Sequence, residues 1–171
     1  MDILALESKR YSTRRFSTKS VSEDDLNRIL EAGRLAPTAK NLQPFKILVI
    51  RSPEGLKKVD EITPCRYGAP LVFLIGYYSS KAYVYPEEGK HLDSGVEDCS
   101  IVLTHMMLEA ASLEIQSCWL NRFSPSKAKE VFDLEDDFMP VAMLDIGYEA
   151  MHAVSPMHEQ KKAKEQLFEE R

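Results

Sequence analysis

The sequence predicts a mixed β-sheet with helices on both faces. Strand-like apolar runs alternate with segments of helical periodicity, which is typical of a sheet covered by helices. Residues 70–78, PLVFLIGYY, are apolar on both faces of an extended chain and therefore predict a central strand. Residues 94–113 carry apolar side chains around most of a helical circumference, so we expect this longest helix to be buried nearly all round.

The elements before the central strand follow from caps and helix breakers. Residues 1–9 predict a short helix whose isoleucine and leucines face inward. Ser22 is an N-cap for a second helix, whose apolar spacing continues until Pro37 stops it. Residues 45–50, FKILVI, predict a strand, and Pro53 opens a third helix because proline is well tolerated in a first turn.

The elements after it alternate in the same way. Residues 79–93 are a polar excursion without clear periodicity, and 115–123 predict a strand. A helix is expected over 124–132 and a final strand over 140–148. The tail from His152 is polar and ends in a helix-prone stretch with few apolar anchors. We therefore expect a domain over 1–150 and an arm over 151–171 that packs on a second subunit.

Composition narrows the class of protein. The 171 residues suit one domain with a real core, and their net charge of -5 argues against nonspecific nucleic-acid binding. No apolar run approaches the roughly 18 residues of a membrane span. Three scattered cysteines and the absence of a signal peptide indicate reduced thiols in the cytoplasm. The four histidines form no ligand set, so no metal site is predicted.

A basic stretch near the start, KRYSTRRFS (9–17), is a candidate phosphate site. Neither GxGxxG nor GxxxxGKS/T occurs, so side chains must hold any phosphate. In an extended chain Arg10, Ser12 and Arg14 share one face, and two guanidinium forks around a hydroxyl suit a phosphate. Tyr11 and Thr13 lie on the opposite face. The same cluster is also compatible with an ordinary solvated surface or with binding of another anion.

Two further segments carry candidate binding groups. Thr38, Asn41 and Gln43 place a hydroxyl and two carboxamides in the loop PTAKNLQPF (37–45). Adjacent donors and acceptors of this kind match the edge of a planar heterocycle such as a pyrimidinedione, although they also suit a capped turn. SCWLNRF (117–123) ends a strand whose free backbone N–H groups could donate to a ring atom; a core strand with buried Trp119 is the alternative.

Taken together, these segments resemble the nitroreductase family of FMN-dependent oxidoreductases. The family pattern R-x-S-x-R-x-F is matched by residues 10–16, and the motif APS-x-x-N-x-QPW by residues 36–45. Residues 105–123 look like the family's buried dimer helix with the following LG-x-x-CW strand, and 141–148 resemble its LGYP strand. The sequence departs from these patterns at Phe45, Glu114, Gln116 and Glu149, which stand where Trp, Gly, Gly and Pro are usual.

The resemblance implies an α+β fold that works as an intertwined homodimer with two FMN sites at the subunit interface. It assigns the FMN phosphate and ribityl chain to Arg10, Tyr11, Ser12 and Arg14. It also implies that five residues of the other subunit contact the flavin: Pro37, Thr38, Ala39, Asn41 and Gln43. Asn121 and Arg122 would approach the flavin through backbone groups, and Lys161 would be the late basic residue on the phosphate.

The activity implied is hydride transfer from NADH or NADPH through FMN to a flat small molecule such as a nitroaromatic or quinone. No catalytic acid or base side chain is expected, since the flavin carries the chemistry. Arg66 is suggested as a cation near the flavin pyrimidine, and residues 79–92 as a cover for the substrate pocket. A non-catalytic FMN-storage protein, or another flavin reaction such as dehalogenation or oxidation of a cyclic intermediate, remains an alternative.

Overall fold

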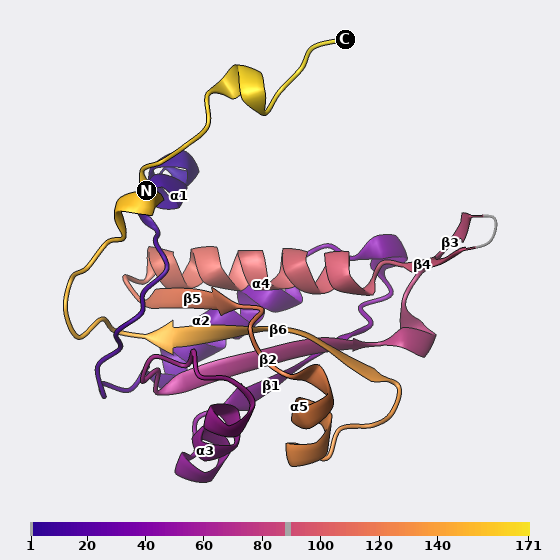
Figure 1. The fold of residues 1–171 in the computed structure, drawn as a ribbon, viewed down its shortest axis with the longest axis horizontal. Coiled ribbons are helices and arrows are strands. Elements are labelled where there is room, and N and C mark those ends of the chain that lie inside the picture. The colour runs from indigo at the N-terminus through magenta and orange to yellow at the C-terminus, as the bar shows by residue number, and fades with distance from the viewer. Residues whose placement is uncertain (1, 88–89) are drawn as a thin grey trace.

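An antiparallel sheet of four strands organises the chain in the computed structural model, which describes residues 2–87 and 90–171 (Figure 1). Every strand pair in it is antiparallel. A parallel bridge between Ser12 and Ser117 adds the N-terminal segment beside the edge strand that contains Ser117. The strands lie in the order β1 (Phe45–Ile50), β2 (Leu71–Tyr78), β6 (Phe138–Gly147), β5 (Gln116–Leu120).

Helices cover both faces of this sheet, so the predicted α+β class is confirmed (Figure 1). One face packs against α2 (Glu23–Arg34) and α4 (Gly95–Ser112), and the other against α3 (Pro53–Ile62) and α5 (Pro125–Val131). Because side chains alternate along a strand, Leu144 and Ile146 of β6 enter the first core while Met143 enters the second. β2 is buried on both faces, as its composition predicts.

Serine caps set the starts of three helices. The Ser22 Oγ accepts the Asp25 N–H at 3.1 Å, and the Ser52 Oγ accepts the Gly55 N–H at 3.0 Å. Ser124 caps α5 in the same way through the Lys127 N–H, at 3.3 Å. Each cap satisfies a backbone donor that the first helical turn leaves open. These starts confirm the sequence prediction.

The polar segment after β2 is more regular than its sequence suggests. A 3-10 turn, η2 (Ser79–Lys81), leads into a hairpin of β3 (Val84–Glu87) and β4 (Lys90–Asp93). The hairpin stands beside the N-terminal end of α4, away from the four-stranded sheet (Figure 1). Its strands are too short and too polar for an alternation of apolar and polar residues to be recognised in the sequence.

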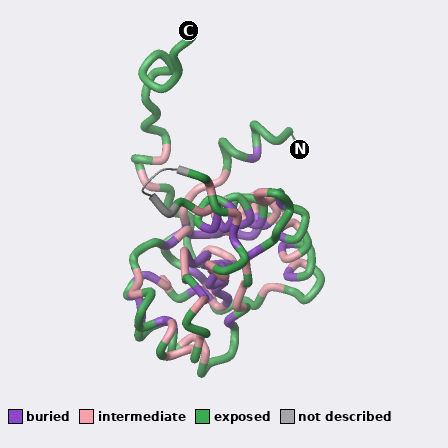
Figure 2. The backbone as a smooth tube through the Cα atoms, turned by 90° about the vertical axis from the view of Figure 1, so that its right-hand side faces the viewer, coloured by how far each residue is buried: buried purple, intermediate pink, exposed green. Residues whose placement is uncertain are grey.

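Both ends of the chain project from the body (Figure 2). The predicted N-terminal helix exists as α1 (Ile3–Lys9), but the expected inward orientation is wrong: Leu6 is buried, whereas Ile3 is 67% and Leu4 is 72% exposed. The helix expected at the C-terminus is also wrong, since residues 151–171 form only the 3-10 turns η3 (Pro156–His158) and η4 (Lys164–Gln166). A segment with so few apolar anchors cannot stabilise a helix alone.

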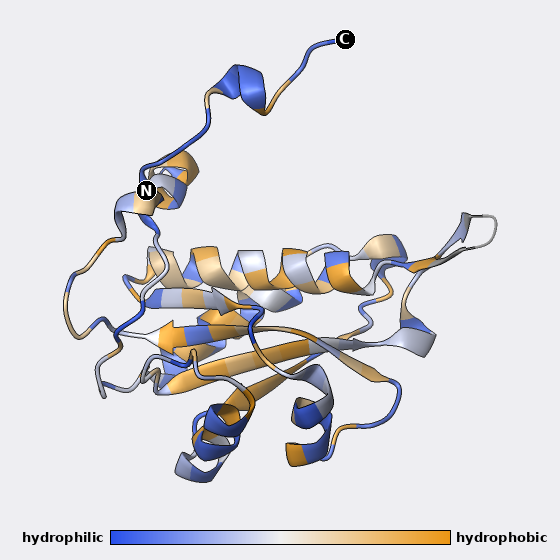
Figure 3. Ribbon diagram, in the orientation of Figure 1, coloured by the Kyte–Doolittle hydropathy of each residue, from blue (hydrophilic) through white to orange (hydrophobic). Residues whose placement is uncertain are grey.

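The outer face of α4 is exposed in the single chain, contrary to the expected all-round burial. Val96 is 52% and Ile101 is 39% exposed, and His105 is exposed between them and the end of the helix. Hydrophobic residues lie along much of this helix as well as on the sheet (Figure 3). No helix of the described residues is long and apolar enough to cross a membrane.

One carboxyl group lies inside the second core. Asp145 of β6 is fully buried and pairs across the sheet with Val72 and Cys118, and among the described residues neither of its carboxyl oxygens has a hydrogen-bond partner. Burial raises the pKa of Asp145 to about 9, and the nearby Arg66 only partly offsets this. The protonated, neutral acid is therefore the form that the folded protein holds at neutral pH.

This burial predicts an unusual pH dependence of stability. The folded protein keeps the Asp145 proton up to about pH 9, whereas the unfolded chain loses it near about pH 4, so stability falls as pH rises between these values. Relative to Asp145→Asn, the wild-type free energy of unfolding should fall by about 1.4 kcal/mol per pH unit from about pH 5 to about pH 8. Urea unfolding across this range measures it, with exposed Asp136→Asn as the control. Parallel pH profiles for wild type and Asp145→Asn would contradict the assignment.

Candidate functional site

The basic N-terminal segment is extended and crosses the free edge of the sheet beside β5. The Thr13 N–H donates to the Ser117 carbonyl at 3.0 Å, and the Ser17 N–H donates to the Tyr148 carbonyl at 2.8 Å. Thr13 is buried, whereas its two neighbours along the chain are not: Ser12 is partly exposed and Arg14 is exposed. The edge position thus turns one side of the segment into the core and leaves the other free to bind a ligand.

Two cavities adjoin this segment. The larger, about 630 Å³, lies between α1, the C-terminal end of α4, the start of β5 and the C-terminal arm, and both Arg10 and Tyr11 line it. The smaller, about 160 Å³, is lined by Tyr11, Ser12, Arg14, Ser155, Met157 and His158. Tyr11 and His158 belong to both linings. The structure therefore brings the four residues predicted at the phosphate to two neighbouring cavities.

The two cavities differ in the charges of their linings. The lining of the smaller cavity includes no carboxylate and provides a guanidinium, an imidazole and three hydroxyls. The lining of the larger cavity, in contrast, contains three carboxyl side chains, those of Glu114, Glu149 and Glu159. Glu114 lies 3.9 Å from the Lys9 ammonium, and both side chains are largely exposed. An anion is therefore better matched by the smaller cavity.

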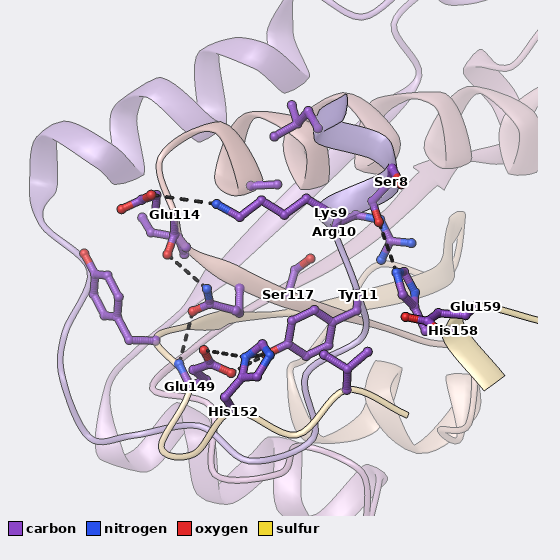
Figure 4. Close-up of a pocket in the computed structure, with 16 residues that line it drawn as sticks. Ser8, Lys9, Arg10, Tyr11, Glu114, Ser117, Glu149, His152, His158 and Glu159 are labelled. Atoms are coloured by element: carbon purple, nitrogen blue, oxygen red, sulfur yellow. Dashed lines mark hydrogen bonds and ion pairs between the residues drawn. The ribbon is translucent and has the colours of Figure 1, made fainter. Parts of the chain in front are cut away.

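Tyr11 is fixed by a network that joins both ends of the chain (Figure 4). Its hydroxyl donates to Glu149 and lies 3.3 Å from the His152 Nδ1, which in turn lies 3.2 Å from the Glu149 carboxylate. Burial and the bond to Glu149 raise the pKa of Tyr11. The Glu149 N–H donates to the Gln116 side chain at 3.1 Å. Two departures from the family pattern, at 116 and 149, thus interact directly.

The C-terminal arm reaches these cavities through His158. Its Nε2 lies 3.1 Å from the Ser8 carbonyl, and its ring stacks edge-on against Tyr11 with centroids 6.2 Å apart. Lys161, the basic residue expected at the phosphate, lines neither cavity, and its ammonium donates to the His158 carbonyl at 2.7 Å. In this conformation of the arm, His158 and not Lys161 lines the smaller cavity.

The second predicted segment, residues 37–43, is a loop with an unusual backbone. Lys40, Asn41 and Gln43 all have positive φ, at 53°, 56° and 49°. Residues with a Cβ rarely adopt this region, and each costs on the order of 1 kcal/mol there. The Thr38 hydroxyl holds the turn by accepting the Gln43 N–H at 3.1 Å. Pro37, Asn41 and Gln43 are exposed, so the carboxamides are open to a ligand.

The two predicted halves of the site lie at opposite ends of α4. The loop is attached at the N-terminal end, where the Ala39 N–H donates to Asp98. The larger cavity includes Ala111 at the C-terminal end. Asp98 and Ala111 are 13 positions apart in this helix, which is about 20 Å at 1.5 Å per residue. Within one chain, therefore, the loop and the basic segment do not meet.

The third predicted segment follows the end of β5. Asn121 and Arg122 are exposed, and the Asn121 side chain is held by two contacts: it accepts the Trp119 indole N–H at 2.6 Å and donates to the Val141 carbonyl at 3.4 Å. The Arg122 carbonyl accepts the Thr63 hydroxyl at 2.6 Å. Trp119 is half-buried rather than fully in the core. These contacts give the end of β5 a fixed shape.

The surroundings of Arg66 and Cys118 favour structural roles for both side chains. The Arg66 guanidinium donates to both Asp60 oxygens, at 2.7 and 2.6 Å, and to the Ala69 carbonyl at 2.8 Å. These bonds favour a structural role over the suggested role beside a flavin. Cys118 is buried, and burial together with Asp145 raises its pKa to about 11, so its thiol is a poor nucleophile.

Sequence reasoning missed Asp98, His152 and His158 as members of this region. The one local signal was Asp98, which lies one position before most of the apolar residues of the helix but beside a second acid, Glu97. The two histidines gave none, because they reach Tyr11 only through the course of the arm. Glu149 stood out only as a departure from the family pattern.

Known proteins resemble this chain in sequence and in fold. The model described as "Nitroreductase family" matches residues 8–67 and 63–148. A protein of Archaeoglobus fulgidus, provisionally named an NADH dehydrogenase/NAD(P)H nitroreductase, is 31% identical over 145 residues, which are 81% of this chain and 80% of that protein. The crystal structure of a nitroreductase family protein from Clostridium difficile is 33% identical, with a TM-score of 0.92 over 99% of this chain and 98% of that chain.

One further structure bears on the cofactor. A protein of Exiguobacterium sibiricum, provisionally named a nitroreductase, was solved in complex with FMN. It is 18% identical and has a TM-score of 0.84 over 100% of this chain and 98% of that chain. At this identity the likeness is one of fold.

Proposed function

This chain belongs to the nitroreductase family, and we propose that it is an FMN-dependent oxidoreductase that passes hydride from NADH or NADPH to a flat small molecule such as a nitroaromatic or quinone. The family match and the names of its relatives support the general oxidoreductase role. The FMN bound by one structural neighbour supports the choice of cofactor. The donor and the acceptor are inferred from the same likeness.

The residues present fit a flavin mononucleotide by their chemistry. Ser12, Arg14 and His158 meet at a cavity whose lining includes no carboxylate, which suits a phosphate, and Arg10 lies in the adjoining cavity. The exposed carboxamides of Asn41 and Gln43 suit the alternating donors and acceptors of a pyrimidinedione edge. When bound, FMN supplies the centre that accepts hydride from the nicotinamide and yields it to the acceptor.

The chain itself contributes placement and electrostatics. Arg10, Ser12 and Arg14 bind the phosphate, and Tyr11 is held beside them by Glu149. Pro37, Thr38, Ala39, Asn41 and Gln43 approach the ring from a second chain. Asn121 and Arg122 approach it through backbone groups at the end of β5. No side chain is assigned a proton transfer. His158 takes the place first considered for Lys161.

The proposal depends on a homodimer, and one observation carries it: the two halves of the site lie about 20 Å apart along α4. The outer face of this helix exposes Val96 and Ile101. Two copies of α4 that pack antiparallel about a two-fold axis bury this face. They also bring the loop of one chain to the basic segment of the other. The exposed arm over 151–171 and α1 then pack on the partner.

The visible spectrum of the purified protein tests the function. We expect visible flavin absorbance that bleaches when NADH or NADPH is added anaerobically and returns with a quinone or nitroaromatic, because the bound cofactor passes hydride between them. Absorbance that persists with either donor would indicate a storage protein. A protein that stays colourless after incubation with FMN would refute both readings.

Replacing the two arginines tests the phosphate site. Arg10→Ala/Arg14→Ala removes two charge-assisted contacts, each about 1.5–3 kcal/mol, so the Kd for FMN should rise at least about a hundredfold with the far-ultraviolet circular dichroism unchanged. Fluorescence titration of FMN measures this. Arg15→Ala, which removes an exposed guanidinium from the same segment, is the control. Unchanged FMN affinity in the double variant would place the phosphate elsewhere.

A charge on the outer face of α4 tests the dimer. Ile101→Arg should shift the protein to monomers in sedimentation velocity, because an unpaired guanidinium would be buried at the interface. FMN affinity should fall with it, since the site needs both chains. Val49→Arg is a control of similar exposure, because Val49 is 38% and Ile101 39% exposed and Val49 lies on the edge strand β1 rather than on α4. An Ile101→Arg dimer that retains FMN would show that another surface makes the interface.

A further inference from the structure

A buried acid holds the predicted flavin loop. Asp98 lies in the first turn of α4 and is only 2% exposed. Its neighbours along the helix, Cys99, Val102 and Leu103, belong to the apolar core. A charged side chain in such surroundings requires specific partners that replace its lost hydration.

Both oxygens of Asp98 have such partners. Oδ1 accepts the backbone N–H of Ala39 at 2.8 Å, and Oδ2 accepts the Ser94 hydroxyl at 2.7 Å. The Ser94 hydroxyl in turn accepts the Tyr83 N–H at 3.2 Å, at the base of the hairpin. Ser94, which directly precedes α4, is itself 1% exposed. The carboxylate is therefore fixed in position before it meets the loop.

The bond to Ala39 acts at the point where the loop needs support. Ala39 begins the 3-10 turn η1 (Ala39–Asn41), whose residues Lys40 and Asn41 have positive φ. The other hydrogen bonds of the turn are internal: the Asn41 N–H donates to the Thr38 carbonyl at 2.9 Å, and the Leu42 N–H to the Ala39 carbonyl at 3.1 Å. Internal bonds maintain the shape of a turn but do not set its position relative to the rest of the protein. The Asp98 bond attaches it to α4.

We propose that Asp98 is a positioning residue, which fixes residues 38–43 in the arrangement that meets the flavin of the partner chain. This inference rests on the proposed function. In the proposed arrangement Asp98 does not contact the cofactor and acts through the Ala39 backbone. Because α4 also provides the dimer face, the same helix then sets both the distance between the subunits and the position of the loop that crosses between them.

The chain offers variants that separate this role from simple stability. Asp98→Ala removes the acceptor, whereas Asp98→Asn keeps an oxygen for the Ala39 N–H. Ala39→Pro breaks the same bond from the other side without altering α4. Proline suits the first position of a turn, and the preceding Thr38 is already extended, with φ -133° and ψ 159°. Glu54→Ala removes an exposed acid from the first turn of α3, away from the proposed dimer face, and serves as the control.

The experiment compares these holoproteins with wild type under saturating FMN. The readouts are the visible circular dichroism of the flavin, the limiting rate of flavin reduction at saturating NADH or NADPH in stopped flow, and amide exchange at Ala39 for wild type and the Asp98 variants. Asp98→Ala and Ala39→Pro should lower the limiting rate about tenfold or more, because small misplacements at a reacting centre are costly. Both should change the visible dichroism. Asp98→Asn should stay within about threefold of wild type, and Glu54→Ala should match it.

The outcomes are distinct. Asp98→Ala and Ala39→Pro with the wild-type rate and dichroism would overturn the positioning role while leaving the proposed function intact. If Asp98→Ala does not fold, Ala39→Pro decides through the same two readouts. Fast exchange at the wild-type Ala39 amide would also overturn it. A wild-type protein that takes up no FMN would overturn the proposed function and this inference together.

Discussion

The helix α4 is the constraint on which the rest of the candidate site depends. It contributes Val102, Leu103 and Met106 to the core against the sheet, and it carries the predicted flavin loop at one end and borders the basic cavity at the other. A rigid helix of this length keeps these two regions apart. The separation cannot be closed by a local movement of either loop. A second chain, related by a two-fold axis, is the simplest way to bring them together.

The opposite face of the sheet anchors the basic segment. Ser12 pairs with Ser117, so Thr13 lies beside Cys118, and Cys118 pairs with Asp145 across the sheet. Thr13 and Asp145 are both buried, and their side-chain oxygens have no hydrogen-bond partner in the part of the chain that the structure describes. This row of small or polar side chains runs beneath the predicted phosphate residues. Its neutrality matters, because an ionised Asp145 would be a buried negative charge near a site meant for an anion.

Much of the fold could be predicted from the sequence because its signals are local. Serine caps and apolar periodicity are confined to a few neighbouring residues, and they gave the three capped helices and the four sheet strands. The positions of the candidate site followed from short motifs in the same way. The exposed face of α4 could not be predicted, since a periodic pattern records which residues are apolar and not what covers them.

Contacts between distant residues were also beyond reach. Tyr11 and Glu149 are 138 positions apart, and Ala39 and Asp98 are 59 apart. No periodicity links such pairs; only the fold brings them together. The position of Lys161, which was expected at the phosphate, could not be predicted for a related reason. It depends on the course of an arm whose large apolar residues are all exposed, and the residue that lines the cavity is His158.

Dividing the site between two chains has a thermodynamic consequence. If the loop and the basic segment come from different subunits, FMN binds the dimer and not the monomer, so binding and association stabilise each other by mass action. The side chains that hold the phosphate then need not form a complete cradle within one chain. This accounts for a chain without a glycine-rich phosphate loop. It is also consistent with the apolar residues exposed on α1 and α4, namely Ile3, Leu4, Val96 and Ile101, which a partner subunit would bury.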